Sequence, residues 1–507
     1  MSTKQKKITW GTALSFGLPD LMGSGGFTIL GVYFMFFLTT FADIPAWEVG
    51  LIIAIARIVD AFVCLFVGPL TDNFYRFSAG RRFGRRRFFI LFGAPLTLVY
   101  ILLWVVVPGN FFYYLAVYLS FEILAAFLMI PWETLPSEMT TDYVERTKLS
   151  TTRMTISAGA AFLATFIPSR IISFIGDQDP KAYLVNGAVW AVLFVLIWLL
   201  CWKNTWERDP EQVMKARKER NKLKENLESD NIGKGSLYID HVINLLMDYV
   251  STLRVRAFRK HLYVYLLSFT GKDFHNAIFA YFIVYSFGLN ASLTGDLLSM
   301  SIIGIPACIL AGFLMVKWGP KWLLTYAYSI MLVMLATYWI VYQIRPSNLV
   351  LTLFVISTIY QIGRATLEFT PWNVFPFIPD IDELLTRKRR EGLFAAVMTF
   401  ARKTTLGIAF IALGFILESV GFQAGTGVEQ SQQTLDGIVY ALIFGTGGLV
   451  LLALLVGLTF KLNRRTHSII IKEIERLKSG GKKEDVDPEV KKICEQLVGV
   501  KYENMWE

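Results

Sequence analysis

Long runs of apolar residues, separated by short polar stretches, dominate the sequence between residues 14 and 460. Each run has about 20 residues, the length that an α-helix needs to cross the hydrocarbon core of a bilayer. The pattern therefore predicts an all-α membrane protein with twelve transmembrane helices. The expected spans are 14–41, 48–70, 88–107, 111–132, 154–176, 183–201, 262–287, 294–316, 321–343, 349–370, 393–417 and 437–460.

Composition supports this class of protein. Hydrophobic residues make up 54% of the 507 positions and charged residues only 18%, against about 25% charged residues in soluble proteins. The net charge of +10 does not indicate a nucleic-acid partner, because the basic residues gather in loops between the apolar runs. That placement is typical of the cytoplasmic side of a membrane protein.

The basic loops predict the topology. Clusters at 81–87, 144–148 and 387–390 and the long stretch 203–260 all fall on one side of the expected bundle, whereas the loops at 42–48 and 420–437 carry few basic residues. We therefore expect a multi-pass protein of the cell membrane whose two termini are cytoplasmic. We expect the lipid bilayer to surround the protein. The sequence is compatible with a monomer.

Similar strings recur in the two halves of the chain in the same order. The pairs are LSFGLPD (14–20) with LSFTGKD (267–273), GPLTDNF (68–74) with GFLMVKW (312–318), and PWETLP (131–136) with PWNVFP (371–376). This order indicates two parallel six-helix halves, as in major facilitator transporters, with a substrate site between them near the membrane midplane.

The repeat sets the expected domain boundaries. They are an N-terminal half 1–202, a cytoplasmic linker 203–260, a C-terminal half 261–461 and a cytoplasmic tail 462–507. Residues 237–253 have apolar positions near helical spacing and are expected to form a helix at the membrane surface. The tail predicts two short amphipathic helices, the second beginning near Pro488.

Ionisable residues inside spans are costly, so each is a candidate functional residue. Arg57 and Asp60 are three residues apart on one helix face and can pair or share a partner. Lys403 needs a carboxylate, and Asp60 is the expected partner, although a static salt bridge is the alternative. Glu122 is a candidate proton site. Asp20 suits a sugar because a carboxylate accepts hydrogen bonds from neighbouring hydroxyls. We consider four further residues weaker candidates for function: Asp273, His275, Arg364 and Glu368. The positive charge of Arg364 can simply neutralise Glu368.

Two further groups of residues are candidates for binding and gating. Trp132 and Trp372 follow prolines at matching positions, where an aromatic face could stack on a sugar or could simply mark the membrane interface. Asp72, Arg81, Arg82 and Arg85 could form charge pairs that latch one conformation, or the arginines could only set the topology.

The sequence contains no phosphate loop, nucleophile triad or metal-ligand pattern, and its four cysteines have no ligand or disulfide spacing. We therefore expect no enzyme activity, no metal site and no cofactor.

Several motifs together resemble the glycoside–pentoside–hexuronide:cation symporter family of the major facilitator superfamily. They are FGLPD, ARIVDA, GRRFGRRR, IPWETLPSEMTTDYVERTKLSTTR, PWNVFPFIPDIDE and RREGLFAAVMTFARK. The resemblance implies a cation-coupled sugar transporter. It assigns Asp60, Arg57 and Lys403 to the cation site, and Asp20, Arg153 and Trp132 to the sugar site.

The sequence departs from the family pattern at the cation site. Cys64 stands where the family's second carboxylate would be, and Met129 aligns with a sugar-binding aspartate. Because Na⁺ prefers several oxygen ligands, we hypothesise that the coupling ion is H⁺. The working hypothesis is a proton-coupled importer of a sugar or glycoside. The alternatives are an uncoupled sugar facilitator, a lysolipid transporter of the same fold, and a sensor that signals through its tail.

Overall fold

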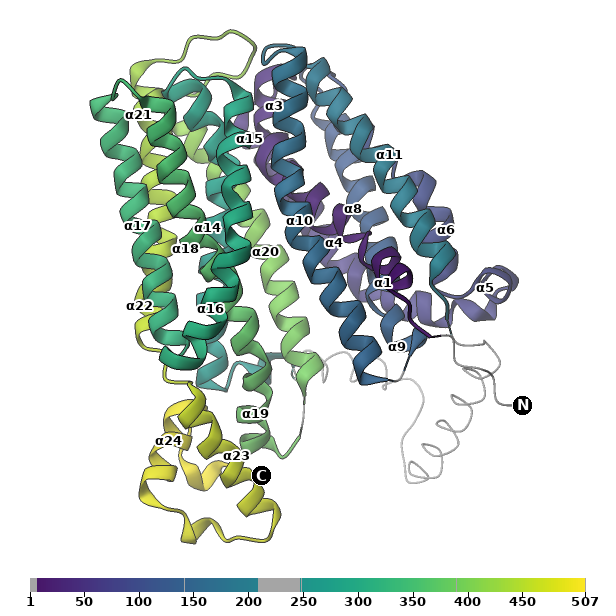
Figure 1. Ribbon diagram of the computed structural model, residues 1–507, viewed down its shortest axis with the longest axis vertical. Helices are drawn as coiled ribbons and strands as arrows, with labels where there is room; N and C mark the ends of the chain where they lie inside the picture. Colours follow the sequence, from purple (N-terminus) through teal and green to yellow (C-terminus); the bar gives the residue numbers. More distant parts are fainter. Residues whose placement is uncertain (1–6, 141, 208–246, 248, 389, 507) are drawn as a thin grey trace. The chain divides into compact units, whose positions relative to one another are not determined.

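The computed structural model describes residues 7–140, 142–207, 247, 249–388 and 390–506, without the side chains of residues 65, 69, 72 and 143. In these ranges the structure is helical and has no strand (Figure 1). The predicted surface helix at 237–253 falls largely outside the described residues, as does most of the predicted linker. The side chain of the predicted gating residue Asp72 also lies outside them.

The N-terminal part of the chain supplies helices at the first six predicted spans. The elements are α1 (Trp10–Gly17), η1 (Leu21–Gly26), α2 (Phe27–Ile29), η2 (Leu30–Phe34), α3 (Met35–Phe41), α4 (Ala46–Asn73), η3 (Phe74–Arg76), α5 (Ser78–Phe83), α6 (Arg87–Leu96), α7 (Val99–Leu102), α8 (Phe111–Glu133), α9 (Leu135–Met139), α10 (Tyr143–Ile175) and α11 (Lys181–Asn204).

The C-terminal part supplies helices at the remaining six. The elements are α14 (Arg256–Tyr281), η4 (Phe282–Ser286), α15 (Ala291–Ser299), η5 (Met300–Ile303), α16 (Gly304–Trp318), α17 (Pro320–Ile344), α18 (Leu349–Val374), η6 (Phe375–Phe377), α19 (Ile378–Thr386), α20 (Glu391–Ser419), α21 (Gln432–Tyr440), η7 (Ala441–Thr446) and α22 (Gly447–Leu458).

Nine helices among the described residues are long and apolar enough to cross a membrane. Several ends differ from the hydropathy boundaries. Helix α10 begins at Tyr143 rather than at 154, because its polar first turns lie beyond the apolar run. The third span ends at Leu102 rather than at 107, and the chain from 103 to Pro108 continues in turns and irregular structure.

The proline motifs do not end the helices where the sequence predicts. Helix α8 continues through Pro131 to Glu133, and α18 continues through Pro371 to Val374. Proline removes one backbone hydrogen bond and kinks a helix without always ending it. Helix α8 therefore ends one residue and α18 four residues beyond the expected spans 111–132 and 349–370.

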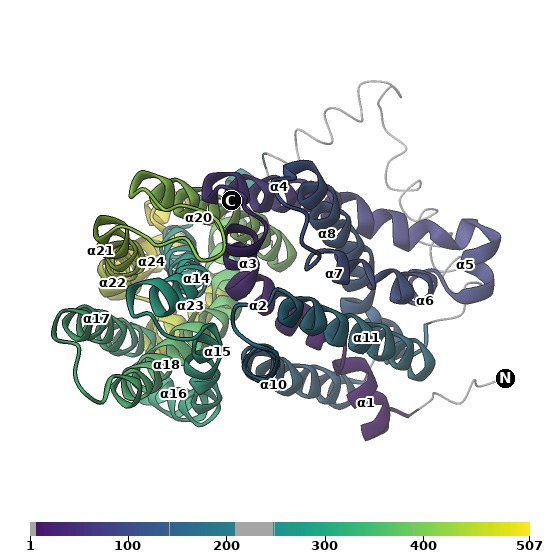
Figure 2. The same cartoon turned by 90° about the horizontal axis from the view of Figure 1, so that it is seen from above.

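The chain divides into two compact units. One comprises residues 1–231, 276–302 and 407–438, and the other comprises 232–275, 303–406 and 439–507. The first unit therefore combines the N-terminal helices with segments from the second half of the sequence. Within it, α10 and α15 pack side by side (Figure 2).

The tail forms the two helices that the sequence predicts, α23 (Arg464–Lys478) and α24 (Pro488–Val498), followed by a turn η9 (Tyr502–Asn504). They pack on α19 (Figure 1). The backbone N–H of Trp506 donates to the carbonyls of Leu384 and Leu385 at 3.0 and 3.1 Å. Cys494, Leu497 and the other apolar residues of the tail join one buried core with the start of α14. Burial raises the pKa of the Cys494 thiol to about 12.

Candidate functional site

The first polar cluster begins at a break in the first transmembrane segment. Asp20 lies between α1 and the π-helical turn η1, within the string GLPDLMGSGG. Pro19 and three nearby glycines disfavour a regular helix here. Asp20 is buried, with 6% of its surface exposed, so its carboxylate faces the protein interior and needs polar partners.

Arg153 on α10 supplies those partners. Its Nε donates to Oδ2 of Asp20 at 3.3 Å, and its Nη2 donates to Oε1 of Glu133 at 2.8 Å. Glu133 is about half exposed. The guanidinium thus links the break in the first segment to the end of α8, as the assignment of Asp20 and Arg153 to one site requires.

Trp132 adds an aromatic ring to this cluster, in contact with the Arg153 guanidinium. The Arg153 guanidinium lies 4.3 Å from the centre of the Trp132 ring, a cation–π contact. The indole N–H donates to the carbonyl of Phe16 at 2.7 Å, and the ring stacks on Phe16. Trp132 is fully buried. In this conformation the tryptophan orients Arg153, and stacking a sugar on the covered face would require the guanidinium to move. The substrate role of Trp132 stays a prediction.

Met129 lies against the same break. A Cβ on Gly23 would stand 2.4 Å from Cε of Met129 and 2.8 Å from Oδ1 of Asp20. The thioether and the carboxylate are therefore neighbours across Gly23, and a larger residue there would require one of these side chains to shift. An apolar, flexible side chain occupies the position where the resembled family has a carboxylate.

A second polar cluster joins α4 to α8. Nη1 of Arg57 lies 3.2 Å from both Oε1 and Oε2 of Glu122. The Glu122 side chain is 1% exposed and that of Arg57 12%. The guanidinium also lies over the ring of Phe27, 4.8 Å from its centre. The sequence left the partner of Arg57 open between Asp60 and others, and the structure identifies Glu122 as one such partner.

Asp60 lies one turn further along α4 and is buried. Sγ of Cys64 donates to Oδ1 of Asp60 at 3.4 Å. A thiol therefore occupies a position within reach of the carboxylate, where a second carboxylate would supply oxygen ligands. Among the described residues, no group of three or more His, Cys, Asp or Glu side chains has the geometry to hold a metal ion.

The C-terminal part contains a counterpart of the first cluster. Asp273 on α14 pairs with Arg402 on α20, and the Arg402 guanidinium lies 5.5 Å from the ring of Phe269. Arg402 was missed by the sequence reasoning. The internal repeat carried the signal, since Arg402 follows Arg153 by 249 residues and Asp273 follows Asp20 by 253.

Other candidates of the C-terminal part lie in the second compact unit. Glu368 accepts from Arg364 at 3.0 Å and pairs with Lys272 at 3.5 Å, so the expected pairing of Arg364 with Glu368 is observed. Trp372 is half exposed and meets Tyr265 edge to face. Lys403 lies on α20 in this unit, whereas Asp60 belongs to the other unit, so their pairing stays a prediction.

The basic loop at 81–87 forms hydrogen bonds with carboxylates of the N-terminal part of the chain. Nη2 of Arg85 donates to Oε1 of Glu138 at 2.9 Å, whereas Arg81 and Arg82 are exposed. The backbone N–H groups of residues 85–87 donate to the carboxylate of Glu207 at 3.1, 2.9 and 2.5 Å. Glu207 thus caps the start of α6, yet burial raises the pKa of this carboxyl group. The gating role of the loop stays a prediction.

A polar contact that the sequence reasoning also missed joins α10 to α15. Asp296 accepts from the hydroxyl of Ser169 at 2.6 Å and pairs with Arg170. The backbones approach closely here, since a Cβ on Gly295 would stand 2.5 Å from the carbonyl oxygen of Thr165. This end of the two helices is therefore closed in the structure.

Comparison with known proteins identifies the family. The sequence matches the family described as MFS/sugar transport protein over residues 15–234 and 240–464. The chain belongs to this family. It is a membrane transport protein with the major facilitator fold and not an enzyme, as the sequence predicts.

Relatives of known name cover almost the whole chain. An uncharacterised symporter of Synechocystis sp. is 26% identical over 94% of this chain and 98% of its own length. The glucuronide carrier protein homolog of Escherichia coli is 23% identical, covering 93% and 97%. The sodium-dependent lysophosphatidylcholine symporter 1-A of Danio rerio is 22% identical, covering 90% and 87%.

A solved structure of the xylose transporter XylE from E. coli, in a partially occluded inward-open conformation, aligns with 90% of this chain and 98% of its own length. The TM-score is 0.56 at 14% identity. This likeness supports the fold.

Proposed function

We propose that this protein imports a sugar or glycoside together with protons by alternating access. The family match and the relatives named as symporters support coupled sugar transport. Under this proposal the protein lies in the cell membrane with both termini in the cytoplasm, and the halves 1–202 and 261–461 move against each other.

The Asp20–Arg153 pair above Trp132 is the observation that carries the proposed substrate site. A sugar hydroxyl can donate to a carboxylate of Asp20 while its oxygen accepts from the Arg153 guanidinium. Both groups are already oriented by protein contacts, so little reorganisation is needed on binding. Trp372 is the proposed aromatic contribution from the second half.

Asp60 is the proposed coupling residue. The sulfur of Cys64 at its carboxylate is a poor ligand for Na⁺, which prefers oxygen. A proton needs only one carboxylate. Arg57 and Glu122 form the charge environment one turn away, and Glu122 is a second group that could accept the proton.

Lys403 is proposed to pair with deprotonated Asp60. Helices α4 and α20 approach closely in antiparallel register, because Cβ atoms on Gly50 and Gly414 would stand 2.5 and 2.6 Å from the carbonyl oxygens of Phe410 and Ala46. Lys403 precedes this contact zone on α20, and Asp60 follows it on α4. This register supports the pairing.

Gating is proposed at both ends of the bundle. Asp72, Arg81, Arg82 and Arg85 would form pairs on the cytoplasmic side in one conformation, and Asp296 with Arg170 closes the opposite side in another. Protonation of Asp60 would remove its charge and permit the change between them.

The proposal is tested in proteoliposomes with the purified protein. A panel of monosaccharides, disaccharides and glucuronides is screened for uptake driven by an inward proton gradient, with and without Na⁺. We expect uptake of at least one sugar to collapse when the gradient is removed and in Asp60→Asn. The matched control Glu48→Gln changes the same charge in the first turn of the same helix and should retain uptake.

Two alternatives have distinct outcomes in the same experiment. Sugar-driven alkalinisation of the medium indicates proton symport, whereas downhill sugar flux without it indicates an uncoupled facilitator. The relative from Danio rerio favours lysophospholipid as a second candidate substrate. Uptake of lysophosphatidylcholine that no sugar inhibits would establish that candidate instead.

A further inference from the structure

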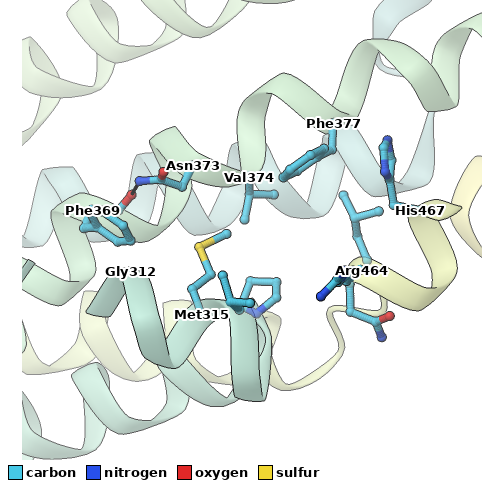
Figure 3. A pocket seen from close by; sticks show the side chains of 12 residues that line it. Gly312, Met315, Phe369, Asn373, Val374, Phe377, Arg464 and His467 are labelled. Carbon is cyan, nitrogen blue, oxygen red and sulfur yellow. Dashed lines mark hydrogen bonds between the residues drawn. The ribbon is translucent and has the colours of Figure 1, made fainter. Parts of the chain in front are cut away.

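A cavity of about 430 Å³ lies where the tail meets the C-terminal helices (Figure 3). This volume is in the range of about 300–1,000 Å³ that is usual for small-molecule sites. The walls come from the end of α16, the end of α18 with η6, and the connector that leads into α23. Its lining residues include Met315, Val316, Phe369, Phe377, Arg464 and His467.

One wall of the cavity is apolar. Met315 and Val316 lie on the last turns of α16, and Phe369 faces them from α18 (Figure 3). Nδ2 of Asn373 donates one hydrogen bond to the carbonyl of Phe369 at 2.8 Å, on the same helix. Val316 is 69% exposed. An apolar chain from the surrounding bilayer can therefore enter along α16.

The other wall is basic. Arg464, the first residue of α23, is exposed, and among the described residues its guanidinium makes no hydrogen bond or ion pair. His467 bonds Asp380 at 2.8 Å, and its ring lies 4.8 Å from that of Phe377 in a tilted arrangement, so the Asp380 carboxylate next to His467 already has a partner. The positive end of the α23 helix dipole adds to the attraction for an anion.

Positive charge on α14 lies against the connector before α23. Lys260 donates to the carbonyl of Thr459 at 2.9 Å. Partial burial lowers the pKa of Lys260, and the neighbouring charges of Arg256 and Lys461 lower it further. Basic groups therefore gather beside the connector, although they do not line the cavity itself.

Tryptophans place the cavity at headgroup depth. Trp318 ends α16 and Trp322 lies in the first turn of α17, and they are 50% and 60% exposed. Exposed tryptophans gather where the hydrocarbon core meets the headgroups. The apolar wall then faces acyl chains, while Arg464 stands at the level of the phosphates.

We propose that this cavity binds an anionic phospholipid of the adjacent leaflet, with an acyl chain along Met315, Val316 and Phe369 and its phosphate on Arg464. The lipid would contact both α16 and α23 and would hold the tail against the C-terminal helices. This site is separate from the proposed sugar and proton sites and does not depend on them.

The test counts lipids that remain bound to the full-length protein in native mass spectrometry, after purification in detergent with equal amounts of phosphatidylglycerol and phosphatidylcholine. We expect the wild type to retain phosphatidylglycerol preferentially. Arg464→Gln should weaken that retention about fivefold, the contribution of one basic residue near an anionic surface.

The chain offers a matched control at the next position. Arg465 pairs with Glu489 at 2.7 Å and does not line the cavity, so Arg465→Gln should retain the lipid. Arg464→Lys keeps the charge and should restore most of the binding, which separates lost recognition from misfolding. Val316→Trp fills the apolar side and should also lower retention.

Three results would overturn the proposal. Equal retention by Arg464→Gln and the wild type would exclude the phosphate contact. Equal retention of phosphatidylcholine would indicate ordinary boundary lipid. Displacement of the lipid by sn-glycerol 3-phosphate at equal concentration would indicate a site for a soluble phosphate compound.

Discussion

Asp273 pairs with Arg402 in the C-terminal helices as Asp20 pairs with Arg153 in the N-terminal helices. In each pair the carboxylate lies on the first helical segment of its half and the arginine on the fifth. Each guanidinium also lies over an aromatic ring, Trp132 in the first pair and Phe269 in the second. The internal repeat of the sequence is therefore also a repeat of ionic contacts.

Both pairs should contribute measurably to stability. We expect double-mutant cycles with Asp→Asn and Arg→Gln changes to give coupling energies of about 0.5–3 kcal/mol for each pair, as is usual for contacting residues. Thermal unfolding in detergent measures them. The exposed pair Arg465–Glu489, with side chains 76% and 64% exposed, is the control and should give less than about 1 kcal/mol. Equal coupling in all three pairs would contradict the interpretation.

The contact of Asp296 with Ser169 and Arg170 should stabilise the conformation that is closed at this end. Asp296→Asn weakens it, and Gly295→Leu prevents the close approach of α10 and α15, so both should increase opening. The readout is labelling by a membrane-impermeant maleimide of a cysteine placed at Val428, which lines a cavity of about 310 Å³ at this end. Asp179→Asn removes a carboxylate that accepts from the backbone N–H of Lys181 at 2.9 Å, at the start of α11, and should leave labelling unchanged.

Glu207 should make stability pH-dependent. Its native pKa is raised above the ordinary value of 4.5 by burial, so the native state holds the proton to higher pH than the unfolded state does. Relative to Glu207→Gln, the wild type should lose stability as the pH rises from about 4.5 to the raised native pKa, and the difference should then stay constant. Unfolding midpoints between pH 4 and 8 check this. A wild type that gains stability over that window would contradict it.

The all-helical fold could be predicted from the sequence, because a continuous run of about 20 apolar residues satisfies its backbone in lipid as an α-helix. The ends could not. Hydropathy marks the part of a helix that is in the membrane, whereas α10 continues for several polar residues beyond it. The ends of α8 and α18 also lie beyond Pro131 and Pro371, since a proline inside a helix does not by itself fix where the helix ends.

The sequence predicts candidate residues such as Asp20 and Arg57, but it does not predict their partners on other helices. Asp20 and Arg153 are 133 residues apart, and Asp273 and Arg402 are 129 apart, so no local spacing reveals either pair. Arg57 was expected to interact near Asp60 on its own helix, and the structure adds Glu122 from α8. Such pairs depend on the rotation of neighbouring helices, which the packing of the whole bundle determines.

Cys64 should determine which ion is coupled to transport. Its thiol bonds Oδ1 of Asp60 at 3.4 Å, so Cys64→Asp would place a second carboxylate beside the first. Two such carboxylates repel each other unless a cation lies between them. We therefore expect Cys64→Asp to acquire Na⁺-dependent stability, about 1.4 kcal/mol at a tenfold excess of Na⁺ over its dissociation constant. Thermal unfolding in NaCl against choline chloride measures it.

Sugar transport by Cys64→Asp should also become dependent on Na⁺, as its stability does. Sugar uptake by the wild type should be equal in Na⁺ and choline, because Asp60 with a thiol neighbour offers Na⁺ too few oxygen ligands. Uptake by Cys64→Asp should increase with Na⁺. Cys64→Ser keeps the size but adds only a hydroxyl, and it should behave as the wild type does. If Na⁺ stimulates the wild type, the proton proposal is wrong, since Asp60 then already belongs to a sodium site.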